Sequence, residues 1–297
     1  RDASVRDAEE HGGGEEIKDE RHPKRAKDSL CSTCHKVRIV IIAQLVLPGA
    51  SEYERKSQRI DFASLSAEHD VRIGEADDAD LIHVYAPDDM RVDVKLLPYV
   101  SNVHPRRRRF RRTAQPEHVI TPLKDAANAF IPEAVDEKYF ASVEKLPGRP
   151  TVGTFARPQL RNIIEQTAAR IQRYRDDVDW LLFDAAPSPD DLRGVDVWVD
   201  PAMTENDFDG FVAEAIVAGT AVIASRTAIN VQRLEKGRTG VLVPPGDPNE
   251  WTHAILAALF KPEFRHSKTA AAQQTASKFR PRHRARALIE LYESILQ

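Results

Sequence analysis

The sequence predicts an α/β protein of two consecutive domains, each built from short buried strands that alternate with helices. Runs rich in valine, isoleucine and leucine recur at strand length, and segments of helical periodicity separate them. Strand–helix–strand units of this size form parallel sheets through right-handed crossovers. Residues 147–150, Pro-Gly-Arg-Pro, read as a hinge between two sets of such elements. We therefore expect a compact pair of Rossmann-like domains preceded by a disordered N-terminal tail.

The overall composition is that of a folded protein with a strongly solvated surface. Of its 297 residues, 41% are hydrophobic and 30% are charged, and the formal net charge is −3. This balance excludes a disordered chain, a collagen and a disulfide-stapled miniprotein. Since general nucleic-acid binders are usually basic, it also predicts no nucleic-acid partner. The longest apolar run, residues 37–47, is far shorter than the roughly 20 residues that span a bilayer. No secretory signal pattern opens the chain, so we expect a cytoplasmic protein.

Residues 1–36 form a polar tail that we expect to be disordered, because they contain almost no large apolar side chains. Cys31, Cys34 and His35 match the pattern for covalent haem attachment, and with His22 they could instead form a zinc site. A haem-bearing redox protein is thus one hypothesis for the function. No helical domain surrounds the motif to enclose a porphyrin, so a chance match in a tail is the preferred interpretation.

The first domain is expected over residues 37–146. Its first strand is predicted at residues 37–42, a β-branched run typical of a buried parallel strand. A helix over residues 51–67 and strands at 71–73 and 80–85 follow. The repeated strand–helix order predicts that these strands pair in one parallel sheet.

The second domain is expected over residues 147–280. Gly219 is predicted to close a helix over residues 210–218 in the left-handed conformation. Asp247, Pro248 and Glu250 predict the start of another helix. We expect residues 281–297 to form an amphipathic helix that packs back on the first domain. The remaining predicted elements are strands at 151–155, 180–183, 195–199, 221–224 and 240–243 and a helix over 160–175.

The most informative segment for function is residues 207–225. Gly210 and Phe211 stand where a helix opens after a strand and a loop, so that exposed N–H groups and the helix dipole could hold a phosphate. Glu214 lies one turn into that helix, where a carboxylate could accept two hydrogen bonds from a vicinal diol such as a ribose. Together they predict a pocket for a nucleoside diphosphate. The residues alone leave open an ordinary helix with a solvated glutamate.

The same segment resembles the C-terminal domain of GT-B glycosyltransferases, in particular the retaining family 4 enzymes. The family pattern is Glu-Gly-Phe-Gly, a second glutamate further on, an Ala-rich helix, Gly-Thr-Pro and a strand. Four other segments resemble the family in the same order. The five similar segments are residues 131–140, 151–157, 208–220, 231–248 and 279–292.

The resemblance implies a GT-B fold and transfer of a sugar from a UDP- or GDP-linked donor to an acceptor, with retention of the anomeric configuration and without a metal or other cofactor. The acceptor would be a sugar, a lipid-linked molecule or a small molecule. Arg157 corresponds to the family's diphosphate-binding arginine, and Arg161 is the nearest cation to its lysine partner. Gly49 stands in the family's glycine-rich loop, and His104 resembles a histidine near the donor sugar.

Some positions depart from the family pattern. The first motif glutamate should stand eight residues before Glu214, and that position is Asn206. An amide brings no negative charge to an oxocarbenium-like centre, and the adjacent Glu205 could substitute only if the loop shifted by one residue. The stretch between residues 170 and 195 is also short for the family. The sequence therefore predicts a hexosyltransferase-type enzyme, with a catalytically degenerate GT-B binding or scaffold protein as the alternative.

An arginine-rich run occupies residues 106–112, with six arginines in seven positions. In the expected first domain this run lies on the acceptor side, so it predicts peripheral contact with an anionic membrane or with a phosphorylated acceptor. A solvated loop is the alternative. The residues assigned to this surface are Arg106, Arg107, Arg108 and Arg109.

Overall fold

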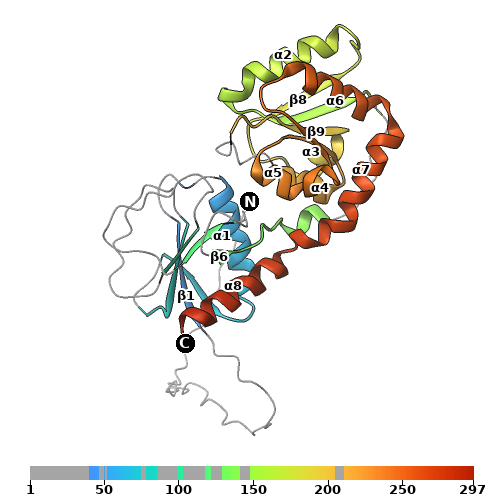
Figure 1. The fold of residues 1–297 in the computed structure, drawn as a ribbon. Helices are drawn as coiled ribbons and strands as arrows, with labels where there is room; N and C mark the ends of the chain where they lie inside the picture. The colour runs from blue at the N-terminus through green and yellow to red at the C-terminus, as the bar shows by residue number, and fades with distance from the viewer. Residues whose placement is uncertain are drawn as a thin grey trace, which may run out of the picture. The chain divides into compact units, whose positions relative to one another are not determined.

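Parallel strands form two separate sheets, one from each half of the chain (Figure 1). The computed structural model describes residues 40–297 except residues 47–49, 51, 75–77, 86–98, 103–117, 122–128, 141–147 and 205–210. The described residues belong to one compact unit of residues 39–297. Parallel sheets with helical crossovers confirm the predicted α/β class.

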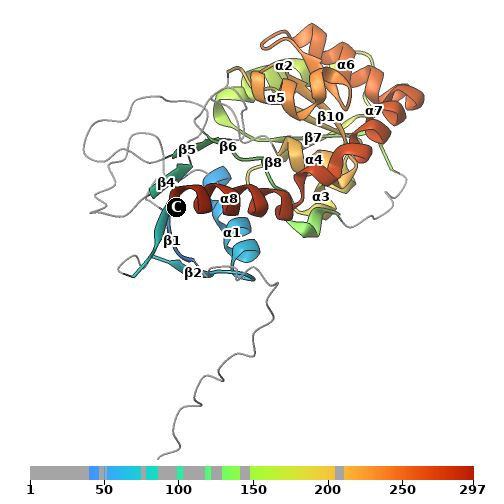
Figure 2. The same ribbon diagram turned by 60° about the horizontal axis from the view of Figure 1, so that its bottom comes forward.

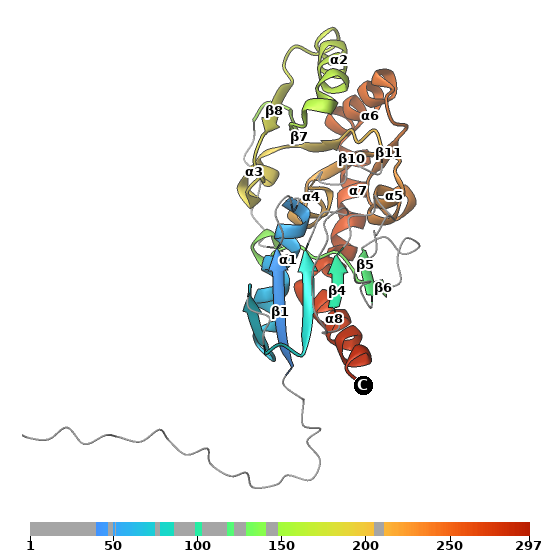
Figure 3. The same ribbon diagram turned by 90° about the vertical axis from the view of Figure 1, so that its left-hand side faces the viewer.

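The first sheet has the strand order β2-β1-β3-β4-β5-β6, and all neighbouring strands are parallel. Figure 3 shows the arrows of β1 and β4 running in the same direction. Helix α1 (Glu52–Leu65) is the crossover between β1 and β2. The strands are β1 (Ile41–Val46), β2 (Asp70–Ile73), β3 (Leu81–Tyr85), β4 (Tyr99–Asn102), β5 (His118–Thr121) and β6 (Ala129–Phe130).

The first strand, β1, covers Ile41–Val46, whereas the sequence predicts it at residues 37–42. Its ladder runs from Ile41, opposite Asp70 of β2, to Val46, opposite Tyr85 of β3. The predicted residues 37–39 lie outside the described ones, and the ladder continues beyond the predicted end at residue 42. The longer strand places Gln44, a polar residue, inside the sheet with no solvent exposure.

The second sheet has the strand order β11-β10-β9-β7-β8 and is also parallel. One buried cluster joins Trp198 to α4 and Phe279, and another joins Val197 to α2 and α6, so helices cover both faces. The strands are β7 (Thr151–Phe155), β8 (Asp179–Phe183), β9 (Val197–Asp200), β10 (Ala221–Ser225) and β11 (Val241–Val243). The helices are α2 (Arg161–Gln172), α3 (Pro189–Gly194), α4 (Val212–Ala218), α5 (Ala228–Arg233), α6 (Pro248–Phe260) and α7 (Pro262–Thr275). Short 3₁₀ helices occur at Glu137–Phe140, Pro158–Leu160, Glu235–Gly237 and Ala276–Phe279.

Local residue chemistry fixes several element ends as the sequence predicts. Asp247 caps α6 by accepting hydrogen bonds from the backbone N–H groups of Asn249 and Glu250. Gly219 ends α4 with φ 84°, a conformation that glycine adopts without steric cost. Gly153 is required by packing, because a Cβ there would lie 2.9 Å from Val195 Cγ1.

The last helix, α8 (Pro281–Ile295), returns to the first sheet. Its buried residues Leu288 and Tyr292 share a hydrophobic cluster with Ile42 and Leu81 of the first sheet and Leu65 of α1. Figure 2 shows α8 beside α1. Within the described part of the chain, no helix has the length and apolar character needed to cross a membrane.

Candidate functional site

A buried ion pair lies at the carboxyl edge of the second sheet. Arg157 follows β7 by two residues, and its guanidinium donates to Asp200, the last residue of β9. The other carboxylate oxygen of Asp200 accepts from Asn230 Nδ2 at 2.9 Å. Ligands of parallel α/β sheets bind outside the carboxyl ends of the strands. Arg157, which is 8% exposed, is therefore positive charge fixed at a place suited to an anion.

Glu214 lies in the first turn of α4 and is 1% exposed. Phe211 precedes the helix in the left-handed conformation, with φ 51°, and its ring packs edge-on against Phe155 at 5.0 Å between centroids. The helix itself begins at Val212. The carboxylate of Glu214 accepts a hydrogen bond from Lys56 Nζ at 2.5 Å. Glu214 is thus a buried, paired carboxylate. The alternative interpretation of the sequence, an ordinary helix with a solvated glutamate, is wrong on this point.

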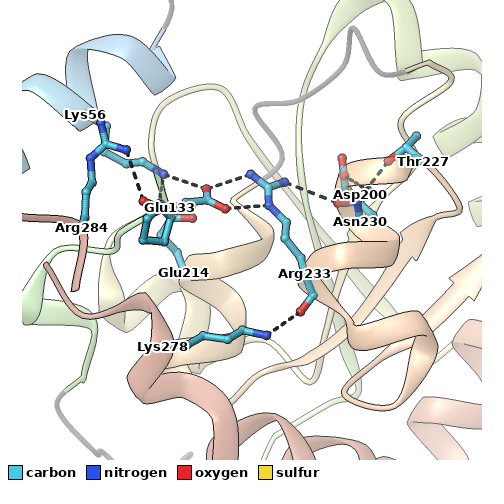
Figure 4. Close-up of polar contacts among 10 residues, drawn as sticks. Lys56, Glu133, Asp200, Glu214, Thr227, Asn230, Arg233, Lys278 and Arg284 are labelled. Atoms are coloured by element: carbon cyan, nitrogen blue, oxygen red, sulfur yellow. Dashed lines mark hydrogen bonds and ion pairs between the residues drawn. The ribbon is translucent and has the colours of Figure 1, made fainter. Parts of the chain in front are cut away.

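A second buried carboxylate, Glu133, stands beside this pair. Arg233, at the end of α5, donates to both oxygens of Glu133 at 2.8 Å. Lys56 Nζ lies 3.6 Å from Glu133 Oε1. Arg233 also donates to Asn230 at 3.4 Å, so polar contacts run without a break from Lys56 to Asp200 (Figure 4).

Burial and charge act in opposite directions on these groups. Burial alone would raise the pKa of the Glu133 carboxyl, but Arg233 and Lys56 together hold that pKa below its usual value. Burial would likewise lower the pKa of Lys56, yet Glu214 and Glu133 raise it above the usual lysine value. Lys56, Glu133 and Arg233 are therefore charged at neutral pH. We call the four side chains Lys56, Glu133, Glu214 and Arg233, which form ion pairs with one another, the crevice cluster; its formal charge is zero.

The crevice cluster lines a small opening in the structure. Its walls include Glu52 and Tyr53 of α1 and Phe211, together with the four charged side chains. The space inside is about 10 Å³, enough for about one water molecule. Three carboxylates, two cations and two aromatic rings can together bind hydroxyl groups, phosphates and a planar base. A ligand larger than water requires some of these side chains to move.

The structure joins two of the predicted site residues through one set of contacts. Arg157 and Glu214 lie at opposite ends of the chain of polar groups, and Phe211 lines the crevice. Arg161 is exposed at the start of α2, outside these contacts. The other predicted residues lie outside the described ones: Gly49, His104, Arg106, Arg107, Arg108, Arg109, Glu205, Asn206, Gly210, and the tail residues Cys31, Cys34 and His35.

Sequence reasoning missed four residues of the site: Lys56, Glu133, Asp200 and Arg233. Glu133 lies in a segment that the resemblance had singled out, but nothing there indicates that its partner is Arg233, 100 residues away. Lys56 and Glu214 are 158 residues apart. Among the residues that the structure describes, no group of three or more His, Cys, Asp or Glu side chains could hold a metal ion.

Comparison with known proteins identifies the second half of the chain. Residues 151–260 match the family model described as glycosyl transferases group 1. A D-inositol 3-phosphate glycosyltransferase of Corynebacterium jeikeium is 32% identical over 117 residues, which cover 38% of this chain and 28% of that protein. Residues 151–260 are thus similar to the group 1 glycosyltransferases. This segment contains Arg157, Asp200, Glu214 and Arg233, whereas Lys56 and Glu133 lie outside it.

The relatives also show how little of a longer protein these matches span. The same kind of enzyme from Nocardioides sp. is 33% identical over 92 residues, which are 31% of this chain and 20% of that protein. In these matches the chain thus spans between a fifth and about a quarter of the relatives' length.

Solved structures extend the likeness to both sheets of the chain. Anabaena HepE in complex with UDP superposes with a TM-score of 0.58 at 14% identity, covering 86% of this chain and 100% of that one. Sucrose-phosphate synthase from Thermosynechococcus elongatus gives 0.63 at 14% identity, covering 86% and 99%. At such identity the likeness shows the fold alone, and that fold is GT-B.

Proposed function

We propose that this protein binds a nucleoside-diphosphate sugar at the crevice cluster and transfers the sugar to an acceptor. The observation that carries the proposal is the contact network that links Arg157 to Glu214, two of the described residues that were predicted to bind the donor. Similar structures support a nucleotide donor, because Anabaena HepE was solved with UDP and with UDP-glucose.

Each part of the site has a defined task in this proposal. Glu214 accepts hydrogen bonds from the two ribose hydroxyls, for which a carboxylate has enough acceptor positions. Arg157, fixed by Asp200 at the carboxyl edge of β7, supplies positive charge toward the diphosphate. Phe211 and Tyr53 provide aromatic surface for the nucleoside. Preorganised positive charge of this kind stabilises the negative charge that grows on a leaving phosphate.

The reaction breaks the bond between the anomeric carbon and the diphosphate oxygen and forms a bond from that carbon to the acceptor oxygen. The acceptor hydroxyl loses its proton to the departing diphosphate, which is a suitable base on the same face of the sugar. We propose that this transfer retains the anomeric configuration and proceeds without a metal ion. Proton NMR of the first product formed and assays with and without a chelator test these two statements.

A catalytically degenerate binding protein is the second candidate, and one observation favours it. The crevice cluster is already charge-balanced, Glu214 is held by Lys56, and the opening has room for about one water. A protein that has lost turnover could keep such a network for stability or for binding a partner. Nucleotide binding without sugar transfer to any acceptor, or to water, would identify this case.

Calorimetric titration with UDP, GDP and ADP tests the proposed function directly. We expect one of the three to bind, and Glu214→Gln to weaken that binding by about 1–3 kcal/mol, the scale of hydrogen bonds to a charged group. The same variant should bind the 2′-deoxynucleotide as well as it binds the ribonucleotide, because the carboxylate that distinguishes them is gone. Glu263→Gln, an exposed position on α7, is the matched control. A wild-type protein that binds no nucleotide contradicts the proposal.

A further inference from the structure

Lys56 is the cation that α1 contributes to the crevice cluster. Its Nζ lies 2.5 Å from Glu214 and 3.6 Å from Glu133. The resemblance to the family predicts a lysine partner for Arg157 in the second domain, and the nearest cation there, Arg161, is exposed and outside the network. A lysine is thus present at the site, but it comes from the other half of the chain.

The cations of the site differ in how firmly they are held. Arg233 makes two parallel bonds to Glu133 at 2.8 Å, and its side chain is 4% exposed. Arg157 is paired with Asp200 and is 9% exposed at the side chain. Lys56 makes one short contact, with Glu214, and a longer one of 3.6 Å with Glu133, and its side chain is 16% exposed. A lysine side chain is flexible, and its ammonium group does not require planar hydrogen-bond geometry. Lys56 can therefore change partners more easily than Arg157 or Arg233.

A nucleoside diphosphate makes two demands on this crevice. Its diphosphate brings negative charge into a partly desolvated space whose own charges already balance, and unpaired buried charge is strongly unfavourable. Its ribose needs the carboxylate oxygens of Glu214, one of which accepts from Lys56. One movement meets both demands, because the departure of Lys56 frees Glu214 and makes a cation available.

We propose that Lys56 is a phosphate-binding residue of the donor site. When the donor binds, the ammonium group of Lys56 moves from Glu214 to the diphosphate, and the ribose hydroxyls then donate to the Glu214 carboxylate. The diphosphate is attached to the same ribose, so the new partner of Lys56 lies one sugar away from the old one. Lysine binds phosphate as a compact point charge in many nucleotide sites. This inference rests on the proposed function and names the group that couples α1 to donor binding.

The test compares ligands that differ only in phosphate. UDP, UMP and uridine are titrated into the wild type, Lys56→Met and Lys56→Arg, with the guanosine and adenosine series in parallel. For the base that binds, we expect Lys56→Met to lower diphosphate affinity about tenfold or more, the scale of a lost charged hydrogen bond. Affinity for the nucleoside should change less than about threefold, because Lys56→Met removes no group that the nucleoside contacts. Lys56→Arg keeps the charge and should retain most of the diphosphate affinity.

A double variant keeps the test decisive if Lys56→Met does not fold, since that change leaves Glu214 buried without a cation. Lys56→Met/Glu214→Gln removes both charges and is compared with Glu214→Gln alone. A further loss of about tenfold in diphosphate affinity supports the inference. Equal affinity of the two, or an equal loss for diphosphate and nucleoside in Lys56→Met, means that Lys56 only holds Glu214 and overturns it. A wild type that binds neither nucleosides nor nucleotides overturns the proposed function and this inference together.

Discussion

Two groups of buried charges in this protein have similar chemistry and different surroundings. One is the crevice cluster. The other, which we call the clasp, joins α8 to α1 and β3 through Asp61, His83, Tyr85, Arg284 and Tyr292. Arg284 donates to both oxygens of Asp61 at 2.6 and 2.8 Å, and Tyr85 Oη donates to the same carboxylate at 2.8 Å. The side chains of Asp61 and Arg284 are each 1% exposed.

Burial and altered pKa values do not distinguish the two groups. Burial raises the pKa of Tyr85 and of Tyr292 in the clasp well above the usual tyrosine value, just as charge partners raise that of Lys56 in the crevice. What differs is open space and the firmness of the contacts. The crevice cluster borders an opening and contains a lysine with one short and one longer ion-pair contact, whereas the clasp pairs its two charges through a bidentate arginine. Perturbed titration indicates function only when a ligand can reach the groups.

The two groups also meet at one point of the chain. Arg284 Nη1 donates to the carbonyl oxygen of Pro132 at 3.3 Å, and Glu133 of the crevice cluster is the next residue (Figure 4). The clasp therefore helps to fix the backbone from which Glu133 reaches Arg233 and Lys56. We interpret the clasp as the structural support and the crevice cluster as the part that exchanges partners.

The largest expected effect comes from breaking the clasp. Arg284→Met should lower the free energy of unfolding by about 3–5 kcal/mol, because it leaves Asp61 buried without its cation. Urea-induced unfolding measures the change. Arg286→Met on the same helix is the control, since Arg286 is 82% exposed at the side chain and its partner Glu290 is exposed as well. We expect that control to cost about 0.5 kcal/mol or less.

A compensating variant sharpens the same prediction. Asp61→Leu/Arg284→Met replaces both charges by apolar groups and should recover most of the stability lost in Arg284→Met. If the double variant were as unstable as the single one, the clasp would contribute through its tyrosine and histidine hydrogen bonds more than through its ion pair.

The fold was predictable where short-range chemistry decides it. Asp247 caps its helix and Gly219 closes another, as the residues and their neighbours predict. The polar contacts that define both charge groups were not predictable in the same way. Asp61 and Arg284 are 223 residues apart, and no local pattern specifies which buried cation meets which buried carboxylate. The resemblance to a family supplied Arg157 and Glu214, but Lys56 required the three-dimensional arrangement.

The crevice cluster should respond to the loss of one carboxylate in two ways. Glu133→Gln should lower the free energy of unfolding by about 1–3 kcal/mol, because Arg233 loses a charged partner while an amide still accepts one hydrogen bond. The same change leaves the crevice with a net positive charge, so affinity for the nucleoside diphosphate should rise about fivefold, an interaction of about 1 kcal/mol. Calorimetry and urea unfolding measure the two effects. A loss of both stability and affinity would show that Glu133 itself contacts the ligand.

Acid and alkali should each reduce the contribution of the crevice cluster to the free energy of unfolding. These effects should be smaller than those of the substitutions above. The pKa of Glu133 is lowered on folding. The stability that its charge contributes is therefore complete above the ordinary carboxyl pKa of 4.5 and is lost as pH falls through the pKa of the folded protein. The pKa of Lys56 is raised, so its contribution is complete below 10.5 and is lost as pH rises through the folded value. The stability difference between wild type and Glu133→Gln, measured across pH, should therefore shrink in acid. A difference that stays constant below 4.5 would contradict this assignment.

The smallest effect on nucleotide binding is expected from a substitution of His83, which is part of the clasp and not of the crevice cluster. His83 Nδ1 lies 2.6 Å from Tyr292 Oη, its ring stacks on Tyr85 at 4.2 Å, and it has no solvent exposure. His83→Asn keeps a polar atom near Nδ1 but loses the stacking, so it should lower the free energy of unfolding by about 1–2 kcal/mol. Nucleotide affinity should stay within about twofold of wild type, because the side chain has no solvent exposure and is not among the residues that line the crevice. A large loss of affinity in a fully folded His83→Asn protein would mean that the clasp and the crevice cluster act as one site, and that the distinction between support and exchange is wrong.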